Sequence, residues 1–303
     1  MKESVRIIYM GTPEFAVAGL QALVEGGYNV VAVVTGPDKP VGRGHHMAYT
    51  PVKEYALQHS LPVLQPDKLK DEAFVEQLRS YQADLQIVVA FRMLPEVVWA
   101  MPRLGTFNVH GSLLPQYRGA APIHWAVIHG DKETGLTTFM LKHEIDTGNI
   151  ILQKKTPIGE DEDTGSVHDR LMEMSKSMVL STTDLIIDCA ERGVALPTTP
   201  QPEIADLLPA PKLFKENTEI DLNKTAAELT NFVRGLSPYP SAWISSMTIK
   251  GQQYENIKVF KVRPGSNNKG ICLPCADGSI EVLELQLPGK KRMSAQALLN
   301  GLH

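Results

Sequence analysis

Short apolar runs alternate with longer amphipathic stretches over the first two-thirds of the chain. The apolar runs are rich in β-branched residues and have the length of strands buried on both faces, whereas the stretches between them have the length of helices. This alternation predicts an α/β fold, a Rossmann-like, doubly wound parallel sheet. The predicted strands are 5–10, 30–35, 85–90 and 106–110, and the predicted helices are 15–26, 51–59, 71–81, 121–129 and 166–192.

The pattern changes after Gly193. The run ALPTTPQPEIADLLPAPK contains five prolines, which is typical of an extended linker. Beyond it, one helical stretch near 225–236 precedes four short strand-like runs with glycine turns, which predicts a small OB-like β-barrel. These strands are predicted at 242–250, 257–263, 270–274 and 279–287. The predicted organisation is a first domain over 1–189, a linker over 190–208 and a C-terminal domain over 209–303.

Length and composition agree with two folded domains. A chain of 303 residues is longer than a single domain with one hydrophobic core usually is. Its content of 43% hydrophobic and 21% charged residues is ordinary for a globular protein. The first residues, MKESVRIIYMG, hold only a short apolar run interrupted by Arg6, too little for a signal-peptide core or a membrane span. With three cysteines in all, these features favour a cytoplasmic protein that does not meet a membrane.

Two of the cysteines, Cys272 and Cys275, have the C-x-x-C spacing. A zinc site of that type needs a second ligand pair and a redox motif needs a helix start, and neither follows in the sequence. Instead, Asp277-Gly278 separates two strand-like runs as in a hairpin. We therefore expect two strand cysteines and no metal.

The net charge of −4 conceals an uneven distribution. Residues 209–303 carry 12 lysines and arginines against 8 acidic residues, a net charge of +4, and the rest of the chain carries −8. This split suggests that the C-terminal part meets a polyanion. A chance excess on a solvated face is the open alternative.

The loop after the first strand does not favour a nucleotide cofactor. Gly11-Thr12-Pro13 stands where a dinucleotide-binding fold has G-x-G-x-x-G, and no Walker A motif occurs in the chain. Ligands of open α/β sheets bind beyond the carboxyl ends of the strands. The stretch FNVHGSLLPQYRGAAPI, at the end of the predicted strand 106–110, is therefore the first candidate site.

Side chains two residues apart on a strand face the same side, so Asn108 and His110 are expected to point together into one cleft. Gly111 removes a side chain where a ligand could approach the backbone. An amide donor beside a group that titrates near neutral pH suits an oxyanion and a proton transfer. A carboxylate would complete the set. Asp146 in HEIDTGNI is the candidate, Glu144 is its competitor, and an Asx-turn at Asp146 is a third interpretation.

The set contains no enzyme nucleophile. The chain has no G-x-S-x-G elbow, no cysteine with a base nearby in sequence, and no H-E-x-x-H motif. This pattern favours direct transfer, in which one substrate attacks another and the protein stabilises the tetrahedral intermediate.

Several segments resemble the methionyl-tRNA formyltransferase family in order and spacing. They are GTPEFA, PDKPVGRG, NVHGSLLPQYRGAAPI and DTGNI, followed by PKLFKENTEIDL, LSPYPSAW and PGKKRMSAQALLNG. The resemblance covers nearly the whole chain. It implies transfer of the formyl group of 10-formyltetrahydrofolate, as a co-substrate, to the amino group of initiator methionyl-tRNA, without a metal. It also implies a chain that works without an obligate protein partner, so we expect a monomer.

The resemblance assigns roles to individual residues. Asn108, His110 and Asp146 match the catalytic trio of the family. The residues implied in folate binding are Ser112, Leu113, Leu114, Pro115 and Phe91. The residues implied in tRNA binding are Arg43, Lys39, Lys212, Lys290 and Lys291.

Two departures from the family pattern qualify this assignment. Arg92 stands where the family usually has glycine, in a segment expected to border the pterin pocket. His45 and His46 stand where lysines are common. They could be metal ligands, but no third ligand is spaced to join them, and a solvated or phosphate-contacting role is favoured.

Two rival functions remain at this stage. One is a folate-dependent formyltransferase that acts on glycinamide ribonucleotide or an amino sugar nucleotide, against which the PDKPVGRG loop and the basic C-terminal part argue. The other is a non-catalytic RNA-binding protein, against which the intact trio argues.

Overall fold

The computed structural model describes residues 2–41, 46–265 and 270–301. They form two compact units. The first comprises Met1–Arg118, Gly135–Lys155 and Asp169–Leu207, and the second comprises Gly119–Thr134, Thr156–His168 and Leu208–His303. Two short segments that lie inside the predicted first domain in sequence therefore belong to the second unit. One holds α5 (Pro122–Ile128), whose Ile128 packs on the C-terminal core.

The first unit is built on a seven-stranded sheet in the order β5-β2-β1-β6-β7-β8-β9. The five strands from β5 to β7 are parallel, as predicted, but β8 pairs antiparallel with β7. The sheet is therefore mixed and not wholly parallel. The strands are β1 (Ile7–Gly11), β2 (Val30–Val34), β5 (Val63–Leu64), β6 (Leu85–Val89), β7 (Thr106–His110), β8 (Glu133–Met140) and β9 (Ile150–Pro157).

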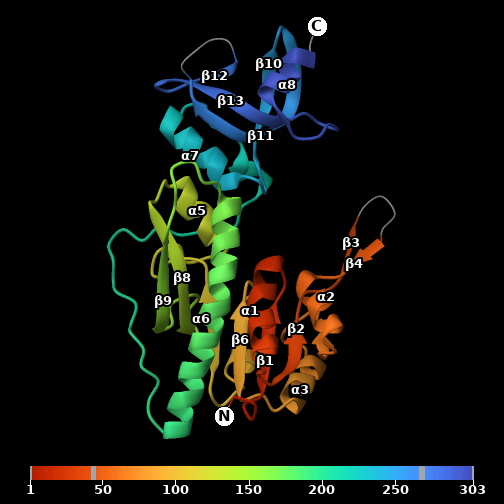
Figure 1. Cartoon of the computed structure of the whole chain (residues 1–303), viewed down its shortest axis with the longest axis vertical. Helices are drawn as coiled ribbons and strands as arrows, with labels where there is room; N and C mark the ends of the chain where they lie inside the picture. The colour runs from red at the N-terminus through yellow and green to blue at the C-terminus, as the bar shows by residue number, and fades with distance from the viewer. Residues whose placement is uncertain (1, 42–45, 266–269, 302–303) are drawn as a thin grey trace. The chain divides into compact units, whose positions relative to one another are not determined.

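Helices cover both faces of this sheet, which confirms the Rossmann-like α/β prediction. Gly19 of α1 (Glu14–Glu25) lies against Tyr9 of β1 and Val179 of α6 (Thr164–Arg192), so these two helices share one face (Figure 1). On the opposite face, Ile8 and Val88 pack in one core with α3 (Glu72–Ser80) and α4 (Glu96–Trp99). The helix α2 (Pro51–Gln58) packs beside α1.

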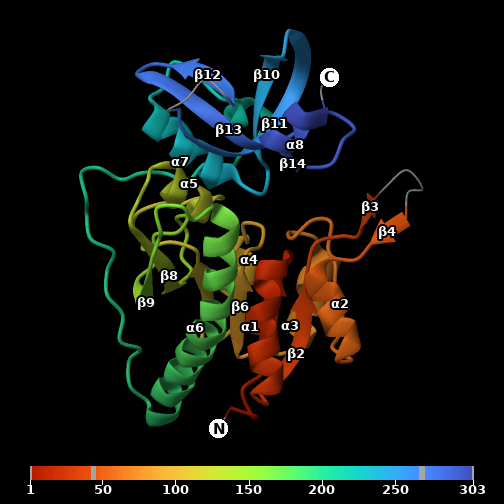
Figure 2. The ribbon, with the colours of Figure 1, turned by 45° about the horizontal axis from the view of Figure 1, so that its top comes forward.

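A two-stranded ladder that the sequence did not predict lies between β2 and α2. It consists of β3 (Lys39–Val41) and β4 (His46–Ala48), which pair antiparallel. Figures 1 and 2 show it projecting away from the seven-stranded sheet. The segment predicted to approach tRNA therefore begins as an extended hairpin.

The second unit holds a five-stranded antiparallel sheet in the order β10-β11-β13-β12, with β14 paired to β13. Its apolar face packs on α7, whose N-terminus carries a capping box of Thr225 and Glu228. The elements are η1 (Lys215–Thr218), α7 (Ala226–Leu236), β10 (Ala242–Ile249), β11 (Gln252–Pro264), β12 (Ile271–Cys275), β13 (Gly278–Gln286), β14 (Met293–Ser294) and α8 (Ala295–Gly301). The strand-rich prediction is confirmed.

The predicted hairpin at Asp277-Gly278 is also confirmed. Cys275 of β12 pairs with Gly278 of β13, and Cys272, which also lies on β12, forms no disulfide. Within the described residues, no helix is long and apolar enough to cross a bilayer, and no group of three or more His, Cys, Asp or Glu side chains is arranged to hold a metal.

Candidate active site

The strand β7 delivers Asn108 and His110 to the carboxyl end of the parallel part of the sheet. Phe107 is fully buried and Val109 is 3% exposed, so the odd positions of the strand pack into the protein. Asn108 and His110 leave the strand on the same face because side chains alternate along it. His110 is opposite Thr137 of the antiparallel neighbour β8.

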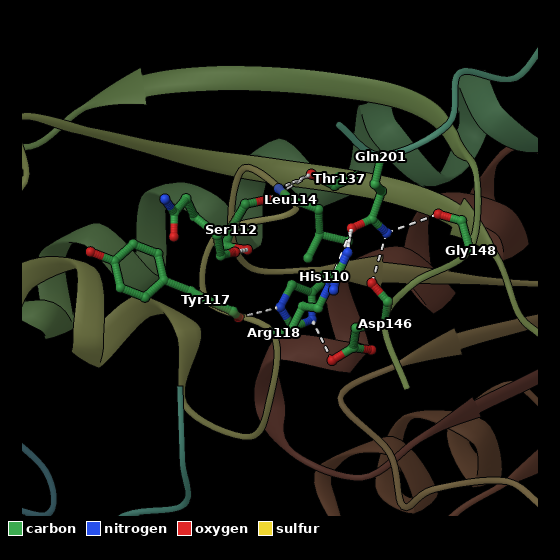
Figure 3. Close-up of polar contacts among 10 residues, drawn as sticks. His110, Ser112, Leu114, Tyr117, Arg118, Thr137, Asp146, Gly148 and Gln201 are labelled. Carbon is green, nitrogen blue, oxygen red and sulfur yellow. Dashed lines mark hydrogen bonds and ion pairs between the residues drawn. The ribbon is translucent and has the colours of Figure 1, made fainter. Parts of the chain in front are cut away.

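The imidazole of His110 is fixed between two oxygen groups. Its Nε2 lies 2.8 Å from the Tyr117 carbonyl, and its Nδ1 lies 3.9 Å from Oδ2 of Asp146 (Figure 3). A carbonyl can only accept, so Nε2 carries a proton and donates it to Tyr117. The ring also meets the edge of Phe139 at a centroid distance of 6.5 Å. Nδ1 is therefore the nitrogen that remains to act on a substrate.

The carboxylate that faces His110 is that of Asp146. Its backbone has φ +53°, a left-handed conformation that Asp adopts more readily than most residues, and its side chain is largely buried. The competing candidate, Glu144, is exposed. The distance of 3.9 Å is within ion-pair range but longer than a hydrogen bond. Catalytic hydrogen bonds of free enzymes are often long and tighten when substrate binds.

The hydroxyl of Thr137 is the centre of the hydrogen bonds that hold the segment after β7. Thr137 donates to the Ser112 carbonyl at 2.7 Å and accepts from the Leu114 N–H at 3.1 Å. The Gln153 amide donates to the same hydroxyl at 3.0 Å and to the Leu114 carbonyl at 2.8 Å. Ser112 in turn donates to the Gln116 carbonyl at 2.7 Å. These bonds fix the backbone of the predicted folate segment.

The side chains predicted to contact folate differ in exposure. Ser112, Leu114 and Pro115 are buried, whereas Leu113 and Phe91 are half-buried. Leu113 packs closely on Gly135 of β8, where an added Cβ would lie 2.6 Å from the leucine. The segment is thus a rigid wall, and its contact with folate stays a prediction.

Arg92, the departure from the family pattern, is bound to the backbone of a neighbouring loop. Its guanidinium donates to the carbonyls of Pro66 at 2.7 Å and Asp67 at 3.0 Å, and it lies 5.3 Å from the centre of the Phe91 ring. The arginine therefore ties the segment after β6 to the segment after β5.

The residues predicted to meet tRNA come from both units. In the first, Lys39 is exposed on β3, and Arg43 lies outside the described residues. The base of this loop is fastened by Lys53, whose ammonium lies 2.6 Å from Asp38. Hydrogen bonds from Lys53 and from the Gln65 amide hold the pKa of the Asp38 carboxyl below its ordinary value.

In the second unit, the three predicted lysines are exposed. Lys212 lies 5.4 Å from the ring centre of Phe214, an aromatic residue that is 55% exposed. Lys290 and Lys291 lie in the turn between β13 and β14.

Sequence reasoning missed four residues that hold this site: Tyr117, Thr137, Gln153 and Gln201. Tyr117 lies inside the motif that was singled out, so its proximity to His110 was available as a hint. The other three come from β8, β9 and the segment after α6, and no spacing in the sequence connects them to His110.

Comparison with known proteins places the chain among formyltransferases. The family model described as formyl transferase matches residues 4–183, and the model of the formyl transferase C-terminal domain matches residues 212–303. The methionyl-tRNA formyltransferase of Bacteroides fragilis is 55% identical, over 100% of this chain and 96% of the relative. That of Porphyromonas gingivalis W83 is 49% identical, over 99% and 96%.

Solved structures agree in fold. The N-formyltransferase from Helicobacter canadensis, in complex with folinic acid and dTDP-3-aminofucose, matches with a TM-score of 0.64 at 17% identity, over 92% of this chain and 98% of that one. Glycinamide ribonucleotide transformylase 1 from Symbiobacterium toebii matches with a TM-score of 0.54 at 21% identity, over 62% and 90%. At these identities the likeness shows the fold alone. The full-length relatives and the two matched family models show more: the chain belongs to the methionyl-tRNA formyltransferase family.

Proposed function

We propose that this chain transfers the formyl group of 10-formyltetrahydrofolate to the free amino group of initiator methionyl-tRNA, which supplies formylmethionyl-tRNA for translation initiation. The observation that carries the proposal is the His110–Asp146 pair, with Nδ1 and Oδ2 3.9 Å apart, at the end of the strand that also presents Asn108. Membership of the family supports the choice of acceptor over glycinamide ribonucleotide or an amino sugar nucleotide.

The hydrogen bond that His110 already makes determines which of its nitrogen atoms can act on the substrates. Because Nε2 of His110 donates to the Tyr117 carbonyl, the protonated imidazole has one further N–H, at Nδ1, which is the donor left for the formyl oxygen. The methionyl nitrogen attacks the formyl carbon, and Nδ1–H together with the Asn108 amide stabilises the oxyanion that forms. Asp146 accepts the proton that the amine loses. The intermediate then breaks its bond to N10, which takes a proton from His110. Asp146 then returns its proton to Nδ1 of His110, so the net reaction moves one formyl group from N10 to the amine and one proton from the amine to N10.

The co-substrate site is proposed to be the wall formed by residues 112–115 with Phe91. The Helicobacter canadensis enzyme, which binds folinic acid, supports a folate ligand in this fold. The hydrogen bonds of Thr137 and Gln153 keep the wall in one conformation, which lowers the entropic cost of binding a rigid pterin.

The second unit is proposed to bind tRNA through its basic and aromatic residues. Lys212 lies over exposed Phe214, and Lys215 lies 4.8 Å from the ring centre of Trp243. Lysines neutralise phosphates and exposed rings stack on bases, so this combination suits a nucleic acid. We propose that the antiparallel sheet is an OB-like platform and that Lys290, Lys291, Lys39 and Arg43 add phosphate contacts. The positive net charge of residues 209–303 supports this assignment.

We further propose that the protein works as a monomer in the cytoplasm. Cys189, Cys272 and Cys275 form no disulfide in the structure, which suits a reducing compartment. The proposed reaction serves translation, which supports the same compartment.

An acceptor assay tests the proposed function. The chain is incubated with formyl-labelled 10-formyltetrahydrofolate and one acceptor at a time: methionyl-tRNA, free methionine, glycinamide ribonucleotide or an amino sugar nucleotide. Uncharged tRNA is the matched control because it offers the same phosphates without the amine. We expect label only on methionyl-tRNA. Faster transfer to a small-molecule acceptor would overturn the proposal.

A further inference from the structure

The proline-rich segment after α6 is attached to the first unit at specific residues. Thr199 and Ile150 exchange two backbone hydrogen bonds, each 2.8 Å long, and so extend the β9 edge by one bridge. Two residues further on, Gln201 reaches the loop that carries Asp146 (Figure 3). A segment predicted as a linker therefore also contributes to the site.

The amide of Gln201 uses its full hydrogen-bonding capacity. Its Nε2 donates to the carbonyls of Asp146 at 2.7 Å and Gly148 at 2.9 Å. Its Oε1 accepts from Nη2 and Nε of Arg118 at 2.6 and 3.2 Å. One neutral side chain thus joins two segments that are distant in sequence.

These two segments carry the two partners of His110. Arg118 directly follows Tyr117, whose carbonyl accepts from Nε2, and Asp146 faces Nδ1. The Asp146 loop needs such an anchor because residues 142–145 are exposed and Asp146 has a positive φ. A shift of the loop would change the distance between Oδ2 and Nδ1, which sets how well the carboxylate supports the imidazole.

We propose that Gln201 is a positioning residue for formyl transfer: it holds the Asp146 loop and the Tyr117–Arg118 segment at fixed places on the two sides of His110. This role rests on the proposed function. Gln201 touches neither substrate in this account, so its effect is on the chemical step and not on substrate affinity.

Two variants test the amide of Gln201, and a third variant is their control. Gln201→Ala removes all four hydrogen bonds of the amide and is expected to lower kcat by about tenfold, an effect on the scale of one ordinary hydrogen bond at the reacting group, with both KM values within about twofold. Gln201→Glu keeps oxygens for Arg118 but has no donor for the two carbonyls, so it is expected to be as slow as the alanine variant. Glu203→Ala, an exposed change in the same segment, is the matched control and should retain wild-type rates.

A double-mutant cycle distinguishes positioning from general loss of structure. If Gln201 acts through Asp146, Gln201→Ala should cost less than about twofold in an Asp146→Ala background. Amide hydrogen exchange in residues 141–149 should accelerate in the alanine and glutamate variants and not in Glu203→Ala.

The outcomes separate this role from the proposed function. Wild-type kcat in Gln201→Ala or Gln201→Glu, or the same tenfold loss in the Asp146→Ala background, would overturn the positioning role alone. Failure of the wild-type chain to formylate methionyl-tRNA would overturn the proposed function and this role with it.

Discussion

The two segments that flank His110 are built differently. Residues 111–118 are mostly buried, and Thr137 and Gln153 hold their backbone from neighbouring strands of the same sheet. Residues 141–149 are largely exposed, and the side chain that anchors Asp146 and Gly148, Gln201, comes from an irregular segment. Residues 111–118 are thus held by the sheet itself, whereas residues 141–149 are held by a side chain from outside the sheet.

This difference suits the two tasks of the proposed reaction. A rigid wall can select one flat co-substrate without an ordering cost. The carboxylate side has to admit the large acceptor and then place Oδ2, which lies 3.9 Å from Nδ1, where it can accept the proton of the amine. A less rigid loop at Asp146 allows the acceptor to enter and the carboxylate to move into place.

The largest effect is expected at the carboxylate. Asp146→Ala removes the group that accepts the amine proton and supports His110, so kcat should fall by about 10²–10⁴. Glu144→Ala, in the same loop, is the matched control and should change kcat by less than about twofold. Steady-state formylation of methionyl-tRNA measures both. Equal losses in the two variants would mean that the structure pairs His110 with the wrong carboxylate.

A smaller effect, on the free energy of unfolding, is expected when a hydrogen bond of the rigid wall is removed. Thr137→Val leaves the buried Leu114 N–H without its acceptor, so the free energy of unfolding should fall by about 1–3 kcal/mol. Urea denaturation of the first unit measures it, with Thr248→Val, an exposed change on β10, as the control. A change below about 0.5 kcal/mol at Thr137 would show that the wall does not depend on this hydroxyl.

The smallest effect is expected on the exposed side. Ile145 is 59% exposed next to Asp146, so Ile145→Ala should change the free energy of unfolding by less than about 0.5 kcal/mol. The same urea experiment measures it. A loss above about 2 kcal/mol would indicate that this loop packs as tightly as the wall and would remove the contrast between the two segments.

The sequence predicted the strand that carries Asn108 and His110. The run TFNVH lies between two glycines, so the predicted strand 106–110 coincides with β7, and strand periodicity places Asn108 beside His110. The pairing of Asp146 with His110 was one of three interpretations that the residues alone left open, and in the structure the Asp146 carboxylate lies 3.9 Å from Nδ1.

The part of the site formed by the Asp146 loop and Gln201 could not be predicted in the same way. Gln201 lies 55 residues from Asp146, in a proline-rich segment without periodicity, so no local pattern indicates its hydrogen bonds. The antiparallel direction of β8 and the packing of α5 on the C-terminal core also depend on tertiary contacts, which an apolar pattern does not specify.

In the proposed mechanism, β7 presents an oxyanion site for direct formyl transfer. The most direct test is the single-turnover rate of transfer from 10-formyltetrahydrofolate to methionyl-tRNA, measured with saturating wild-type and Asn108→Ala enzyme. We predict that the variant is slower by about 10²–10³ because it lacks one oxyanion donor. A loss of less than about tenfold would contradict the assignment of Asn108 and with it the proposed chemistry.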